Sequence, residues 1–239
     1  MYDSVYNKEL RANNVFEFDI DYNKAYKLVQ LQIEQLNQTV LFEPDLKYLH
    51  LKDLPLPLFV KIPNWHGDIT WVSAASKETF DFFDTCFKDL EIAEKTKRIA
   101  NLDFPLVMYS VFFVVRSYGN AIHFHYDYLK TGISAFTLMT PIQIDEKAAL
   151  GHLLYKNTLN SISKYIYKKG KAVALGSDFI HSTEPFESKQ KFIFLCFTYG
   201  CTDLDMWEKI KETAAYQGVS FRHPNGNIVV RDPAFEQYF

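Results

Sequence analysis

The sequence predicts a mainly β protein with flanking helices, built around an antiparallel double sheet of the sandwich or jelly-roll type. Helical periodicity is concentrated in the first 100 residues, whereas from Pro105 to about residue 200 short β-branched and aromatic runs alternate with turn-rich pieces. The 239 residues contain no repeat and no Gly/Ser-rich or Pro-rich linker. We therefore expect one domain: helical and β support in 1–100, a jelly-roll core in 101–200 and a C-terminal extension in 201–239.

Two amphipathic helices are expected in the supporting region. Apolar positions spaced by three and four residues predict a helix over about 22–36, with Asp21 placed to cap its start. The same spacing predicts a second helix over about 77–95. The apolar positions are Tyr22, Ala25, Val29, Ile33 and Leu36 in the first helix, and Phe80, Phe83, Phe87 and Leu90 in the second. Because each helix has one apolar face, both are expected to pack on a sheet.

The core region is expected to consist of short strands. Six runs carry the β-branched and aromatic residues, namely 107–115, 133–139, 151–155, 165–167, 172–175 and 191–198. Many short strands at this spacing are typical of an antiparallel double sheet. The extension carries the pattern of a short helix over 205–216, and the residues that follow it have no assignment.

Composition and charge exclude several classes of protein. With 48% hydrophobic and 16% aromatic residues the chain can bury enough surface to fold, and a formal net charge of −3 gives no basis for a dedicated nucleic-acid binder. The longest apolar runs, 109–115 and 192–198, are far shorter than the roughly 20 residues that span a bilayer. The first residues lack the pattern of a secretory signal. We expect a cytoplasmic protein with a small-molecule or peptide partner and, without a Cys-x-x-Cys pair, structural cysteines.

The most informative stretch is the segment 121–128, which reads Ala-Ile-His-Phe-His-Tyr-Asp-Tyr. On an extended strand residues two apart share a face, so His123, His125 and Asp127 are expected to point the same way. Imidazole and carboxylate groups on one face can bind a metal. An isolated His-x-Asp is more often a hydrogen-bonded structural pair, so this segment alone does not decide between the two interpretations.

A second histidine favours the metal site. His181 lies 56 residues after His125, at the end of a predicted strand. His125, Asp127 and His181 together form a 2-His-1-carboxylate set, which suits non-haem Fe(II) and leaves three coordination positions open. His123 could instead replace His125 as the first imidazole, although it more readily lines the cavity or hydrogen-bonds behind the ligands.

A lone cation, Lys191, stands ten residues after His181 at the start of the apolar run 191–198. Burying a cation without an anionic partner is costly. Lys191 is therefore expected either to extend to water or to pair with a carboxylate.

With these residues the sequence resembles the Fe(II)/2-oxoglutarate-dependent oxygenases, in a prolyl-hydroxylase-like pattern. The matching positions are His125-x-Asp127, the turn at 151–154, the approach to a strand at 167–174, His181 and Lys191. The resemblance covers about residues 105–200. The turn at Gly151 lacks the second glycine and the acidic residue of the pattern, and Tyr167 stands where the pattern has proline.

The resemblance implies a double-stranded β-helix (jelly-roll) core and an enzyme that binds Fe(II) with 2-oxoglutarate as cosubstrate and dioxygen as oxidant. Lys191 would pair with the far carboxylate of 2-oxoglutarate, and Tyr109, Thr183 and Thr137 could contact the cosubstrate. The substrate could contact His123, Arg116 and Tyr118, the last two also being within reach of 2-oxoglutarate.

The reaction implied by the resemblance is oxidation of a C–H bond, most simply its hydroxylation. The expected substrate is a small molecule such as an amino acid or a secondary metabolite. The alternatives are a protein or peptide side-chain hydroxylase, a cupin-like metalloenzyme that does not use 2-oxoglutarate, and a binding module that kept the fold without the chemistry. Asp127 argues against halogenation, because related halogenases have a small residue there.

Overall fold

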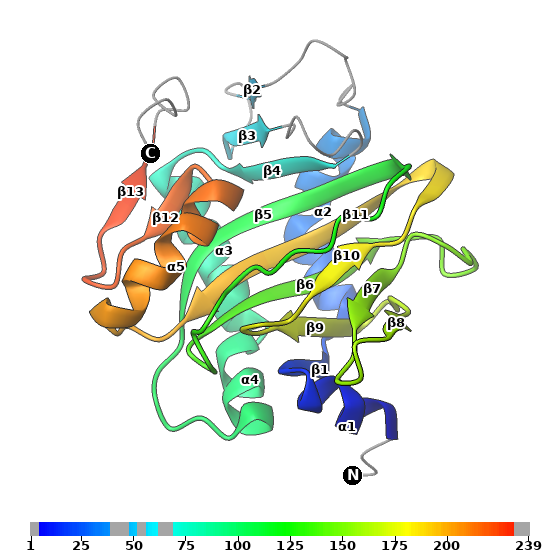
Figure 1. Ribbon diagram of the computed structural model, residues 1–239. Helices are drawn as coiled ribbons and strands as arrows, with labels where there is room; N and C mark the ends of the chain where they lie inside the picture. Colours follow the sequence, from blue (N-terminus) through cyan, green and yellow to red (C-terminus); the bar gives the residue numbers. More distant parts are fainter. Residues whose placement is uncertain (1–4, 39–47, 52–55, 62–68, 232–239) are drawn as a thin grey trace.

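The structure, a computed structural model, describes residues 5–38, 48–51, 56–61 and 69–231. Helices cover one face of a large antiparallel sheet and a small antiparallel sheet lies on its other face (Figure 1). The large sheet has the spatial order β1 (Val15–Asp19), β9 (Lys171–Leu175), β6 (Ala135–Gln143), β11 (Phe186–Gly200), β5 (Val107–Gly119), β4 (Thr70–Ala74), β3 (Leu58–Lys61) and β2 (Tyr48–Leu51). The small sheet has the order β10 (His181–Thr183), β7 (Leu153–Lys156) and β8 (Ile162–Tyr165). The predicted mainly β, jelly-roll class is confirmed.

The helices precede the core in the chain, as predicted, but one of them is divided. They are α1 (Val5–Ala12), α2 (Tyr22–Gln38), α3 (Lys77–Asp89) and α4 (Ile92–Ala100). The Asp21 carboxylate accepts a hydrogen bond from the Lys24 backbone N–H at 3.0 Å, which confirms the predicted start of α2. The single helix expected over 77–95 is wrong, because Glu91 adopts a left-handed backbone conformation with φ of 55° between α3 and α4. No glycine or proline marks this break in the sequence.

Each predicted run in the core overlaps an observed strand. The run 107–115 lies within β5 and the run 191–198 lies within β11, while 165–167 meets β8 only at Tyr165. The structure adds β1 to β4, which precede the core, and a C-terminal hairpin of β12 (Ser220–Arg222) and β13 (Ile228–Val230). These short strands had no clear signal, since their pairing with distant strands decides their conformation more than local sequence does.

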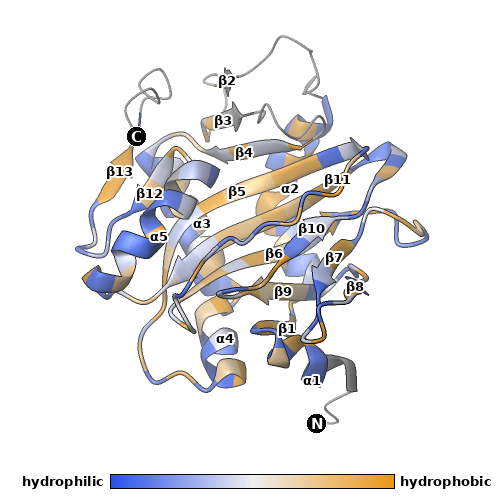
Figure 2. Cartoon of the chain, viewed as in Figure 1, coloured by the Kyte–Doolittle hydropathy of each residue, from blue (hydrophilic) through white to orange (hydrophobic). Residues whose placement is uncertain are grey.

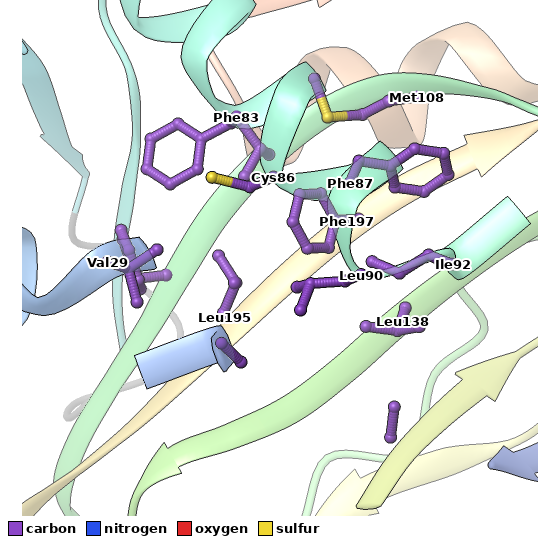
Figure 3. Close-up of a cluster of buried hydrophobic side chains, with 14 of the residues drawn as sticks. Val29, Phe83, Cys86, Phe87, Leu90, Ile92, Met108, Leu138, Leu195 and Phe197 are labelled. Atoms are coloured by element: carbon purple, nitrogen blue, oxygen red, sulfur yellow. The ribbon is translucent and has the colours of Figure 1, made fainter. Parts of the chain in front are cut away.

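Alternation along β11 divides the interior into two layers. Ile193, Leu195 and Phe197 face the helices, whereas Phe194 and Cys196 face the small sheet. In the helix-side layer Phe87 of α3 packs on Phe197 with ring centres 5.5 Å apart (Figure 3). The central strand β5 is correspondingly rich in hydrophobic residues over much of its length (Figure 2). The layer between the two sheets is the one that contains the candidate site.

The C-terminal extension packs beside β5. The short helix expected over 205–216 is confirmed as α5 (Leu204–Gln217). Trp207 of α5 packs edge-on against Tyr109 of β5, with ring centres 5.3 Å apart. In the part of the chain that the structure describes, no helix is long and apolar enough to span a bilayer.

A buried ion pair attaches the C-terminal hairpin to α3. The Arg222 guanidinium lies 2.9 Å and the Lys88 ammonium 2.7 Å from carboxylate oxygens of Asp84, whose side chain is 9% exposed. Burial raises the pKa of Asp84, but the hydrogen bonds from Arg222 and Lys88 more than offset this effect. The net pKa lies below its ordinary value.

Replacing this carboxylate should give a pH-dependent loss of stability. Asp84→Asn is expected to lower the free energy of unfolding by about 1–3 kcal/mol at pH 7, because Arg222 loses its anionic partner. A carboxyl whose pKa is lower in the folded state stabilises the fold at pH values above its unfolded-state pKa. This stabilisation is lost as the pH falls through the native pKa. Urea unfolding should therefore show wild type and variant converging below about pH 4. A constant difference between pH 3 and pH 7 would contradict the ion-pair explanation.

Candidate metal centre

Three side chains converge where the segment that follows β5 pairs with β10 of the small sheet. His125 and Asp127 follow β5, and His181 is the first residue of β10. The ligand atoms of all three lie within 4.8 Å of one another. The Nε2 atoms of His125 and His181 lie 3.8 Å and 3.9 Å from the same Asp127 oxygen. Because metal–nitrogen and metal–oxygen bonds are about 2.0–2.2 Å long, one ion can reach all three groups with a small contraction.

Backbone pairing brings the two histidines together. The N–H of His125 donates to the carbonyl of His181 at 2.9 Å, and the N–H of His181 donates to the carbonyl of His125 at 3.0 Å. This isolated antiparallel bridge places the imidazole ring centres 4.4 Å apart. The segment around His125 is therefore not the regular strand that was expected over 121–128, although it extends the small sheet by this one bridge.

Hydrogen bonds from the rings leave the same nitrogen of each histidine available. The Nδ1 of His125 lies 3.0 Å from the carbonyl of His123, and the Nδ1 of His181 lies 3.1 Å from the carbonyl of Phe179. A backbone carbonyl can only accept, so each Nδ1 carries the proton and each Nε2 keeps a lone pair. Both lone pairs belong to the nitrogens nearest Asp127, which is the tautomer that a metal site requires.

The electrostatics of the cluster keep His181 neutral. Burial lowers the pKa of His181 well below its ordinary value; the Asp127 carboxylate opposes this effect, and His125 adds to it. A neutral imidazole is the metal-binding form, so His181 is ready to act as a ligand at pH 7. Asp127 is 7% exposed, while the His125 side chain is 40% exposed. The cluster thus has one accessible ligand and two shielded ones.

A cavity opens directly on these three groups. Its wall is mainly apolar and aromatic, and Asp127 is the only carboxylate of the described lining, which includes two histidines but no lysine or arginine. The lining consists of Ile69, Trp71, Phe112, Val114, His125, Asp127, Thr137, Met139, Leu153, Tyr167, His181, Thr183, Cys196 and Gln217. Burial raises the pKa of Cys196, so this cysteine stays a thiol and behaves as an apolar wall residue.

The structure brings some of the other predicted site residues to the cavity and not others. Thr183 and Thr137 line it. His123 is exposed and outside the ligand cluster, so the alternative in which it replaces His125 is corrected. Tyr118 is 45% exposed on β5 and does not line the cavity. The buried Tyr109 hydroxyl donates to the carbonyl of Cys201, within the contact between β5 and α5, which removes it from the cosubstrate.

Lys191 departs from its predicted role. Its ammonium donates to the carbonyl of Leu36 at 2.7 Å and to that of Asn37 at 3.4 Å, at the C-terminal end of α2. Residues of odd number on this part of β11 face the helices, which places Lys191 on the opposite side of the sheet from the cavity. Lys191 therefore donates hydrogen bonds to carbonyls at the end of a helix, which lack a partner within the helix. The cation expected to pair with the cosubstrate must be another residue.

Arg116 is a cation on the cavity side of the sheet. Residues of even number on β5 point to that side, since Phe112 and Val114 line the cavity. Arg116 is 5% exposed and its guanidinium lies 5.0 Å from the centre of the Phe186 ring. Burial raises the pKa of the Tyr167 phenol, the Arg116 charge lowers it, and Asp127 raises it further. Tyr167 therefore stands within electrostatic range of both the cation and the metal-site carboxylate.

Two residues of the extension that contact the candidate site had no signal in the sequence. The Thr213 hydroxyl of α5 donates to the backbone carbonyl of Asp127, and Gln217 at the end of α5 lines the cavity. The periodicity of the sequence predicted the helix α5, but it did not predict which residues this helix contacts. Only the packing of α5 beside β5 reveals that the extension contacts the backbone of Asp127.

Comparison with known proteins identifies relatives in fold. No protein-family model matches the sequence, and no curated protein sequence matches it. Among solved structures, the non-haem α-ketoglutarate-dependent epimerase SnoN from nogalamycin biosynthesis is 9% identical, with a TM-score of 0.57 over 82% of this chain and 79% of that one. HygX from Streptomyces hygroscopicus, solved with nickel, 2-oxoglutarate and hygromycin B, is 10% identical, with a TM-score of 0.56 over 83% of this chain and 88% of that one.

A third structure supports the same fold. An oxidoreductase of the 2OG-Fe(II) oxygenase family from Burkholderia pseudomallei is 10% identical, with a TM-score of 0.53 over 82% of this chain and 88% of that one. The chain thus has the fold of 2-oxoglutarate-dependent oxygenases, which confirms the resemblance at the level of structure.

Proposed function

We propose that the protein is a non-haem Fe(II)- and 2-oxoglutarate-dependent dioxygenase that hydroxylates a C–H bond of a small molecule. The observation that carries this proposal is the convergence of His125, Asp127 and His181 on one cavity of a jelly roll whose structural relatives are such oxygenases. Two imidazoles and one carboxylate on one side of an ion form a facial set with open positions on the other side.

The side chains present fit Fe(II). The donor set offers two neutral imidazole nitrogens and one carboxylate oxygen, and the buried Cys196 thiol does not compete for the metal. When bound, Fe(II) and 2-oxoglutarate supply the oxidising chemistry, with dioxygen, succinate and carbon dioxide as the other reactant and products. The backbone carbonyls of His123 and Phe179 orient the two rings, so the site is arranged before the metal arrives.

The cavity wall performs the protein's remaining tasks, which are orientation and exclusion of water. The wall includes side chains that offer a bound molecule no strong hydrogen-bond partner, namely Phe112, Val114, Met139 and Leu153. An apolar wall around a reactive centre limits side reactions with water. The position of the C–H bond beside the metal ligands then decides which carbon is oxidised.

We assign the cation for the distal carboxylate of 2-oxoglutarate to Arg116. Its side chain is on the cavity side of β5, about 7 Å further along the strand than Val114. A guanidinium pairs with a carboxylate through two parallel hydrogen bonds. Tyr167 lines the cavity, and its pKa responds to the charges of both Arg116 and Asp127.

The relatives favour a small-molecule substrate. SnoN has been solved with Fe3+, α-ketoglutarate and nogalamycin RO, and HygX with hygromycin B. Both ligands are small molecules rather than polypeptides. We extend this class of substrate to the present protein because it shares their fold and its own cavity belongs to the jelly-roll core.

The proposal predicts that turnover depends on 2-oxoglutarate. Purified protein supplied with Fe(II), dioxygen and a panel of amino acids and metabolites should form succinate, and a substrate should stimulate its formation several-fold. Liquid chromatography with mass spectrometry measures both succinate and the oxidised product. Dioxygen consumption and product formation at full rate without 2-oxoglutarate would instead indicate a cupin-like enzyme.

A further inference from the structure

We propose that Gln217 is a substrate-binding residue, and that it selects an uncharged, largely apolar molecule carrying a hydroxyl or amide N–H group. The inference rests on the proposed function, because it names the substrate class of that same cavity. It assigns a role to the C-terminal extension, for which the sequence offered none.

The first observation is an unsatisfied acceptor in the cavity wall. The Oε1 atom of Gln217 is buried and accepts no hydrogen bond from any residue that the structure describes. Gln217 lines the cavity that also contains His125, Asp127 and His181. Leaving a buried carbonyl oxygen without a donor costs free energy, so a donor from a bound molecule is the partner this atom lacks.

The second observation is that the fold holds Gln217 in place relative to the metal ligands. Four residues earlier on α5, the Thr213 hydroxyl donates to the Asp127 carbonyl. Immediately after α5, the Val219 N–H donates to the Ser73 hydroxyl of β4 at 3.3 Å. A backbone held on both sides of Gln217 reduces the entropy that is lost when its amide binds a ligand.

The third observation is the character of the surrounding wall. Ile69 and Trp71 line the cavity with Gln217, and the Trp71 ring packs edge-on against Tyr216 at 5.3 Å, which places it beside the end of α5. Asp127 supplies the only carboxylate of the described lining and is committed to the metal. With Asp127 on the metal and Arg116 on 2-oxoglutarate, a charged substrate would lack a counter-ion there, whereas an aromatic or aliphatic ring with one donor fits the wall.

The test uses fluorinated probes that differ in one group. We would measure the dissociation constants of 4-fluorobenzyl alcohol and its methyl ether by 19F NMR, first without metal and then with anaerobic Fe(II) and 2-oxoglutarate. The alcohol should bind wild type at least about fivefold more tightly than the ether, because only the alcohol can donate to Gln217. Paramagnetic broadening by Fe(II) should place the probe beside the triad.

Matched variants isolate the amide. Gln217→Met keeps the side-chain length and should reduce the alcohol preference to about one, while Gln190→Met, at an exposed position, should leave it unchanged. If Gln217→Met does not fold by circular dichroism, Gln217→Asn shortens the arm and should also lower the preference.

Three results would overturn the inference: an unchanged preference in the Gln217 variant, tighter binding of 4-fluorobenzoate or 4-fluorobenzylammonium than of the alcohol when Fe(II) and 2-oxoglutarate are bound, or no binding of any probe to wild type. Failure of the proposed function is a different result. It would appear as no effect of Fe(II) and 2-oxoglutarate on a probe that still prefers the alcohol form.

Discussion

Replacing His181 with alanine is expected to abolish the Fe(II)·2-oxoglutarate complex. The His181 side chain is shielded from solvent, and the other two ligands come from a single segment that cannot surround an ion alone. Mutating groups that only hydrogen-bond to a ligand typically costs 10–100-fold in metal affinity, so losing the ligand itself should cost more than about 100-fold. Anaerobic titration with Fe(II) and 2-oxoglutarate should give a weak visible charge-transfer band in wild type and none in the variant.

His123 provides the matched control for this experiment. It lies two residues before His125 and is exposed, and its backbone carbonyl lies 3.0 Å from the Nδ1 of His125. His123→Ala keeps that carbonyl and should retain both the band and the iron affinity. A lost band in His123→Ala together with a retained band in His181→Ala would show that the ligand set is misassigned.

The second large effect is expected at Arg116. Arg116→Met removes the proposed partner of the distal carboxylate of 2-oxoglutarate. Losing a desolvated charge pair costs about 2–5 kcal/mol, which corresponds to a rise in the dissociation constant of roughly 30-fold to several thousand-fold. The charge-transfer titration measures this constant directly. 2-Oxobutyrate, which has the same chelating groups but no distal carboxylate, should bind wild type and variant equally.

Lys191→Met is the control that separates the two candidate cations. Burial lowers the pKa of Lys191, and its ammonium serves the last carbonyls of α2 on the other side of the sheet. The variant should unfold at a lower urea concentration but bind 2-oxoglutarate as wild type does. A large loss of 2-oxoglutarate affinity in Lys191→Met, with none in Arg116→Met, would restore the assignment made from the sequence.

Lys191 and Arg116 illustrate why spacing along the chain is a limited guide. The ten-residue interval after His181 is a property of sequence, but the face on which a strand residue points changes with every single step. The pairing of β11 with β5 is irregular between Glu187 and Phe192, so the register of Lys191 depends on that irregularity. An inference from spacing cannot include it.

The sequence by itself determined the elements whose signals are local. Alternating apolar runs predicted the core strands, helical spacing and the Asp21 cap predicted α2, and the residue types at His125, Asp127 and His181 predicted a ligand set. Each of these signals depends on side-chain chemistry or on periodicity within a few residues, which the chain carries before it folds.

The tertiary structure alone decided which groups meet. The backbone bridge between His125 and His181 joins positions 56 residues apart, and the packing of α5 brings Thr213 and Gln217 to the candidate metal site. It also placed Arg116 on the cavity side of the sheet and Lys191 against α2. Strand pairing and helix packing depend on contacts between distant segments, and a single sequence read locally contains no record of which distant segments will touch.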